Sequence, residues 1–151
     1  MANITPADFP AIKTELLDPH YGPIIAANPT ADAQNYALAA ELNKTPSWKA
    51  GDVVFRSNLR RVDVLKAIVG TEYLALTQAQ RDLLSTILLE AQLDVNDPDV
   101  RAQLAGIFAA GTATRTAINQ AARRACSRLE ALLTRPDATI EGWDVAAARA
   151  S

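Results

Sequence analysis

"AGIFAAGTATRTAINQAARRACSRLEALL", residues 105–133, contains two apolar runs separated by Gly111. Glycine commonly ends a helix, and the threonines at 112 and 114 have side chains that can cap the next one. Ala and Leu then recur at three- and four-residue steps as far as Leu133, which is the period of a helix that buries one face. The stretch therefore predicts two consecutive packed helices, the second running over 112–135.

The second of these helices is basic, and its charge allows two interpretations. It carries five arginines against one acid, Glu130. A helix that reads DNA presents basic and polar residues near its N-terminus, whereas these arginines lie in the middle and C-terminal half. Arg124 and Arg128 are four residues apart and would share one helix face. We therefore favour a face that meets solvent or an acidic partner over a DNA-binding helix.

Composition indicates a globular protein built from packed helices. Of the 151 residues, 49% are hydrophobic and 21% charged, which is ordinary for globular proteins. Only 5% are aromatic, so the core must be built from Ala, Leu, Ile and Val, which suits closely packed helices. The formal net charge of −2 argues against a general polyanion-binding protein. No apolar run approaches the ~20 residues of a membrane span, and no leader pattern is visible, so we expect a cytoplasmic origin and no membrane contact.

The start signals along the chain predict one mainly α domain over 1–151, with about five to seven helices. They are Thr5-Pro6, Thr30, Thr77 with Gln80 as a capping box, and Asp97-Pro98. The helix after Thr77 is predicted to reach about Leu93. The expected parts are Pro-rich N-terminal helices and loops (1–50), an extended basic segment (52–61), a helical core (62–135) and a C-terminal extended segment with a short helix (139–151).

A short extended or β-ribbon element is expected near residues 52–60. "DVVFRSNLRRVDVL", residues 52–65, is the one stretch with clear β character, and no strong second strand is visible in the sequence. Such a strand pairs either within its own chain or with a neighbouring chain, and basic flanks keep it soluble until then. We therefore predict a partner-binding surface formed by Trp48, Val53, Phe55, Arg56, Arg60 and Arg61, with the Arg124 and Arg128 face second.

Candidate catalytic and metal-binding residues are sparse. His20 is the single histidine, and its place between Pro19 and Tyr21 favours a hydrogen-bonded loop residue over a catalytic base. Cys126 is the single cysteine, which excludes an intrachain disulfide and a thiolate metal cluster, and we interpret it as a half-buried structural residue. The chain is therefore predicted to have no catalytic residues and no metal.

Two further motifs favour structure over ligand binding. "DVNDPD", residues 94–99, is rich in oxygen ligands but lacks the glycine and distal Glu of a calcium loop, so Asp97 is expected to cap a helix. The six glycines stand apart and form neither GxGxxG nor GxxxxGK, so no phosphate-binding loop and no cofactor are expected. An enzyme is accordingly disfavoured.

Several stretches resemble a family of small proteins encoded by tailed bacteriophages. The matching features are "DPHYGP" (18–23), Leu42-Asn43, the basic extended stretch 53–61, the helix expected over 77–93, "FAAGTATR" (108–115) and "EGWDVAAAR" (141–149). Members of that family lie among virion-assembly genes and are mostly without assigned function.

The resemblance implies a non-enzymatic structural protein of the neck, tail or fibre region, located in the virion and assembled in the host cytoplasm. Its expected partners are other virion proteins and copies of itself. The alternative is a small phage regulator that binds nucleic acid through the Arg-rich helix 112–135.

Overall fold

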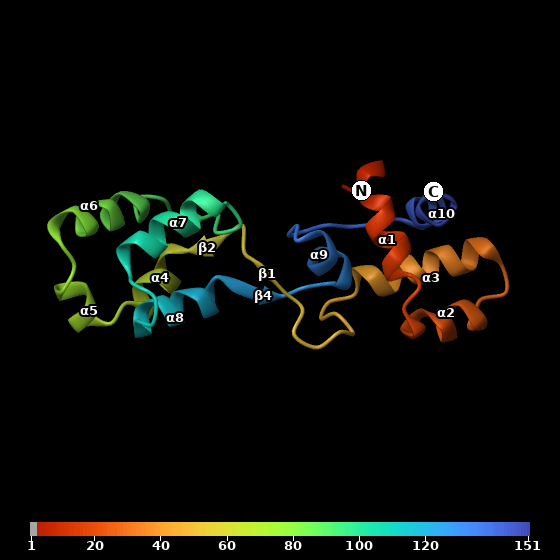
Figure 1. Cartoon of the computed structure of the whole chain (residues 1–151), viewed down its shortest axis with the longest axis horizontal. Helices are drawn as coiled ribbons and strands as arrows, with labels where there is room; N and C mark the ends of the chain where they lie inside the picture. Colours follow the sequence, from red (N-terminus) through yellow and green to blue (C-terminus); the bar gives the residue numbers. More distant parts are fainter. Residues whose placement is uncertain (1–2) are drawn as a thin grey trace. The chain divides into compact units, whose positions relative to one another are not determined.

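The mainly α fold is confirmed by a computed structural model, which describes residues 3–151 (Figure 1). Ten α-helices and four short strands are present among these residues. None of the described helices is long and apolar enough to cross a membrane. The contacts divide the chain into two compact units. The organisation of 1–151 as one domain stays a prediction.

The first unit comprises residues 3–54 and 125–151. Its core is formed by buried side chains from both segments, among them Ile12, Leu38, Leu129 and Val145. α3 packs against both α9 and α10, and α1 also packs against α10. The elements are η1 (Pro6–Asp8), α1 (Phe9–Glu15), η2 (Pro19–Tyr21), α2 (Gly22–Ala27), α3 (Ala31–Asn43), α9 (Arg128–Leu133) and α10 (Gly142–Ala150).

Asn43 joins the two segments of the first unit. Its side-chain amide donates to the backbone oxygen of Ile140 at 2.7 Å, and its side-chain oxygen accepts from the backbone N–H of Ile140 at 3.0 Å. Ile140 is buried in the core, so the backbone that enters α10 is satisfied by a side chain from the end of α3.

The second unit comprises residues 55–124. Its core includes Leu59, Leu84, Leu104, Phe108 and Ile118. α4 packs against α8, and α6 packs against α7. The elements are β2 (Leu59–Arg60), α4 (Arg61–Ala67), α5 (Gly70–Leu74), α6 (Gln78–Ile87), β3 (Gln92–Leu93), α7 (Pro98–Ile107) and α8 (Ala113–Ala121).

Two strands carry the chain into and out of the second unit. They are β1 (Val53–Phe55) and β4 (Arg123–Ala125), which are neighbours in a two-stranded sheet. A second two-stranded sheet pairs β2 and β3 antiparallel, with Leu59 opposite Leu93 and Arg60 opposite Gln92. The extended element expected near 52–60 is therefore present, and it pairs within its own chain.

The single helix predicted over 112–135 is wrong. The chain forms α8, then β4, then α9, because the residues from Arg123 to Ala125 pair with β1. α9 has its own start signal, since the Ser127 hydroxyl accepts from the Glu130 N–H at 3.2 Å and Glu130 accepts from the Ser127 N–H at 2.8 Å. Arg124 lies in β4 and Arg128 begins α9, so the two do not share a helix face.

A smaller correction concerns the helix expected to reach Leu93. α6 ends at Ile87, and Leu93 belongs to β3, where its side chain is buried in the second core. The start of α6 matches the prediction, because Thr77 and Gln80 form the expected capping box. Asp97 also caps α7 as expected, by accepting from the backbone N–H of Asp99 at 2.8 Å.

Candidate functional site

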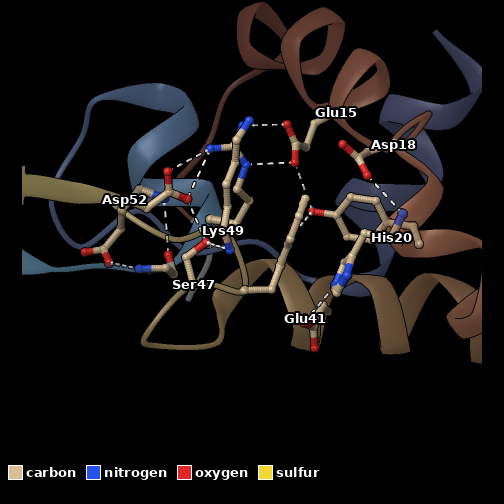
Figure 2. Close-up of polar contacts among 12 residues, drawn as sticks. Glu15, Asp18, His20, Glu41, Ser47, Lys49 and Asp52 are labelled. Atoms are coloured by element: carbon tan, nitrogen blue, oxygen red, sulfur yellow. Dashed lines mark hydrogen bonds and ion pairs between the residues drawn. The ribbon is translucent and has the colours of Figure 1, made fainter.

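Arg128 of the first unit forms hydrogen bonds with two carboxylates, those of Glu15 and Asp52, which Figure 2 labels. Its Nε and Nη2 atoms each lie 2.7 Å from an oxygen of Glu15, and its Nη1 lies 3.1 Å from Asp52 Oδ2. The side chains of Arg128, Glu15 and Asp52 are only 11%, 9% and 13% exposed. The hydrogen bonds with Glu15, more than those with Asp52, raise the pKa of Arg128 above its usual range. The cluster therefore holds one cation between two carboxylates.

Three rings extend this cluster on the side of Glu15. The His20 ring stacks on Trp48 at a centroid distance of 4.0 Å, and its Nε2 lies 3.0 Å from Glu41 Oε1. Trp48 donates its indole N–H to the Tyr21 hydroxyl at 3.2 Å, and that hydroxyl donates to Glu15 Oε1 at 3.3 Å. Burial raises the pKa of the Tyr21 hydroxyl above its usual range. His20 is hydrogen-bonded as predicted, but it lies in η2 and not in a loop.

The side chains of this network are hydrogen-bonded to one another. Each polar side chain in it is hydrogen-bonded to another member, so the groups stabilise one another across α1, α3 and α9. Ser47 donates to Asp52 at 2.6 Å and so positions the second carboxylate. Among residues 3–151, no group of three His, Cys, Asp or Glu side chains is placed to hold a metal ion. Cys126 is fully buried, more than the half-burial expected.

A cavity of about 490 Å³ lies within the second unit. Apolar side chains form much of its lining, and Arg101, Arg115 and Arg123 complete it; we call it the arginine-lined cavity. The guanidinium groups of Arg101 and Arg123 lie 4.4 and 5.3 Å from the centre of the Phe55 ring. Its lining is Phe55, Val95, Pro98, Arg101, Ala102, Leu104, Ala105, Phe108, Arg115, Ile118, Asn119, Ala122 and Arg123.

The arginines of this cavity have no acidic partners in the described chain. Arg101 donates to the backbone oxygens of Val95 and Asn96 at 2.8 and 2.6 Å. Arg115 donates to the backbone oxygens of Ala105 and Phe108, both at 3.2 Å. Within residues 3–151, no carboxylate forms an ion pair with Arg101, Arg115 or Arg123, and no acidic residue lines the cavity. The cavity is therefore lined mainly by apolar side chains and carries a positive charge from its arginines.

Charge is divided unequally between the two units. Residues 55–124 contain nine Arg and Lys against seven Asp and Glu, a formal net charge of +2. The remainder of the chain contains six against ten, a net charge of −4. The net charge of −2 for the whole chain is therefore the sum of a basic second unit and an acidic first unit.

The predicted partner-binding residues are divided between the two units and have different surroundings. Trp48 and Arg128 belong to the network of the first unit, and Arg128 is occupied by its two carboxylates. Phe55 lines the arginine-lined cavity. Val53 is exposed in β1, and Arg61 is exposed at the start of α4. Arg56 and Arg60 line a second, more polar cavity of about 630 Å³, and Arg60 is paired with Asp63 at 2.9 Å.

The structure also exposes large apolar side chains that the sequence did not single out. Trp143 is 62% exposed in the first turn of α10, and Leu17 is 79% exposed after α1. In the second unit, Leu74 and Leu89 are 71% and 77% exposed. Exposed apolar side chains are common singly, but those large enough to anchor an interface mark candidate contact points.

Comparisons with protein-family models, with characterised proteins and with solved structures found no match to this chain.

Proposed function

We propose that the chain is a non-enzymatic structural component of a tailed bacteriophage particle, of its neck, tail or fibre region, and acts through protein–protein contacts. The observation that carries the proposal is that the chain has both exposed apolar side chains, such as Trp143, and a positive cavity. The arginines of this cavity lack acidic partners within residues 3–151. A protein partner with acidic residues would bury the apolar area and neutralise these arginines.

The phage assignment rests on the sequence resemblance of the stretches 18–23, 108–115 and 141–149. The first and last of these belong to the first unit, and 108–115 contains the Gly111 turn and the Thr112 cap of α8. Gly111 has a φ of +86°, a conformation that favours glycine, so the turn between α7 and α8 depends on a glycine at this position. Other virion proteins and copies of this chain are the proposed partners.

The alternative, a regulator that binds nucleic acid, has one observation in its favour, the basic second unit. The helix on which that alternative depended is interrupted by β4, and Arg128 is paired with Glu15 and Asp52. Nucleic-acid binding would therefore need exposed arginines such as Arg123 in place of a continuous basic helix.

Mass spectrometry of purified virions of the phage that encodes the chain tests the proposal. We expect peptides of this chain at multiple copies per particle, and their absence from particles would overturn it. A duplex-binding titration at two salt concentrations tests the alternative, because phosphate contacts lose affinity steeply with salt. Micromolar, salt-sensitive binding that Arg123→Ala with Arg124→Ala abolishes would establish the regulator instead.

A further inference from the structure

Trp143 projects from an acidic and aromatic part of the first unit. It lies between Glu141 and Asp144, and within the described residues neither carboxylate forms an ion pair with a basic side chain. The ring of the exposed Tyr36 covers Gly142, because a Cβ added there would lie 2.7 Å from Tyr36 Cδ1. Val145 is buried on the core side of the same helix, which fixes α10 beneath Trp143.

The arginine-lined cavity has the complementary properties. It opens to solvent, since Ala102, Asn119 and Arg123 in its lining are exposed. Its volume of about 490 Å³ falls within the range of about 300–1,000 Å³ of cavities that hold organic ligands, which is large enough in volume for an indole ring. Its arginines have no carboxylate partner in the part of the chain that the structure describes.

We propose that Trp143 of one copy inserts into the arginine-lined cavity of a second copy. The indole is the aromatic ring that attracts cations best, and Arg101, Arg115 and Arg123 surround the space that it would fill. Glu141 and Asp144 would enter beside it and pair with those arginines. The net charges of −4 and +2 on the two units favour the same encounter.

This contact uses different surfaces of the two copies, so it is head-to-tail. Such contacts generate rings where the rotation closes and open chains where it does not. The proposal rests on the proposed function, since it identifies the self-contact through which a structural subunit would assemble.

The test measures the mass of the full-length protein over a concentration series by sedimentation velocity. We expect concentration-dependent association that Trp143→Ala weakens by more than about tenfold, the loss expected when a buried interface tryptophan is truncated. Arg123→Glu, at an exposed position of the cavity, is expected to weaken it similarly. Leu89→Ala and Lys66→Glu are matched controls at other exposed positions and should associate like the unsubstituted protein.

Mixing the two defective variants gives the sharpest result. The Arg123→Glu protein keeps its tryptophan and the Trp143→Ala protein keeps its cavity, so the mixture should form a one-to-one dimer that grows no further. A protein that stays monomeric at all concentrations would overturn the proposal, as would a mixture that remains monomeric while the unsubstituted protein associates. If virions contain the chain but the protein stays monomeric, this contact fails while the proposed function stands. If the protein associates as expected but virions contain no peptides of it, the proposed function fails while this contact stands.

Discussion

Arg128 and Glu15 are 113 positions apart in the chain and form two parallel hydrogen bonds, both 2.7 Å long. The Arg128 guanidinium, at the start of α9, thus donates through Nε and Nη2 to the Glu15 carboxylate at the end of α1. Its Nη1 donates to Asp52. Because all three side chains are nearly buried, each depends on the others for its charge. The ion pair therefore joins the two separate segments of the first unit.

Replacing Arg128 by alanine should destabilise the first unit strongly. The change leaves Glu15 and Asp52 as buried carboxylates without their cation, for which we expect a loss of about 3–5 kcal/mol in the free energy of unfolding. Urea unfolding followed by tryptophan fluorescence measures it, because both tryptophans, Trp48 and Trp143, belong to the first unit. The control is Lys44→Ala, which breaks an exposed pair with Glu41 in the same unit and should change stability little. Equal effects of the two substitutions would contradict the role of the cluster.

Replacing Ser127 by alanine should shorten or loosen α9. The Ser127 hydroxyl caps the helix at the Glu130 N–H, and loss of such a cap costs about 1 kcal/mol. Thermal unfolding monitored by far-ultraviolet circular dichroism, which reports the helices of both units, is expected to show a lower Tm. Ser85→Ala, at an exposed position within α6, is the control and should leave Tm unchanged or slightly higher. A Tm unaffected by Ser127→Ala would mean that α9 does not depend on its cap.

Replacing Glu72 by glutamine should change the acid dependence of stability. Hydrogen bonds from the Thr114 side chain first, and then from the backbone N–H groups of Thr114 and Ala113, hold the pKa of Glu72 below its usual 4.5. A carboxyl whose pKa is lower in the folded chain adds stability above its unfolded pKa, and this contribution is lost as pH falls through the folded pKa.

The unsubstituted protein should therefore be more stable than the Glu72→Gln protein at pH 7, and the difference should shrink below pH 4.5. Far-ultraviolet circular dichroism during urea unfolding at several pH values measures the difference. Glu90→Gln is the matched control, since the exposed Glu90 side chain makes no hydrogen bond within residues 3–151. A difference that persists unchanged at pH 2 would show that the charge of the Glu72 carboxylate is not its cause.

Two glycines of the second unit should respond to alanine in opposite directions. Gly106 lies within α7 with open space at its Cβ position, so Gly106→Ala is expected to stabilise by about 0.5–1 kcal/mol. Gly111 also has open space, but its φ is +86°, so Gly111→Ala is expected to destabilise by about 1 kcal/mol. Urea unfolding of both variants checks the signs, and the same sign for both would contradict the conformational argument.

Predictions from the sequence succeeded where the signals were local. Thr77 with Gln80 and Asp97 with Pro98 lie within four residues of the groups that they cap, so both helix starts could be located. The break after Ala121 could not be located in this way, because Arg123–Ala125 pairs with a strand about 70 positions away. One local signal was nevertheless overlooked, the Ser127 to Glu130 capping box inside an otherwise periodic apolar stretch.

The candidate site was less accessible to sequence reasoning. Phe55 was predicted to belong to a partner-binding surface, but its neighbours Arg101 and Arg123 come from α7 and β4, and only the fold brings them over its ring. Arg128 was assigned to a helix face that meets solvent or an acidic partner, whereas Glu15 and Asp52 of its own chain bury it. Such groupings depend on contacts between distant segments, which periodicity does not encode.

The split of the first unit into residues 3–54 and 125–151 has a consequence for synthesis on the ribosome. α1 and α3 are translated early, but α9 and α10, against which they pack, emerge last. The 70 residues from 55 to 124 emerge between them and need no later segment to complete their own core. At about 5–20 residues per second, the nascent α3 has α2 beside it but lacks α9 and α10 for several seconds while the second unit emerges. The second unit therefore has all of its core residues outside the ribosome before the first unit does.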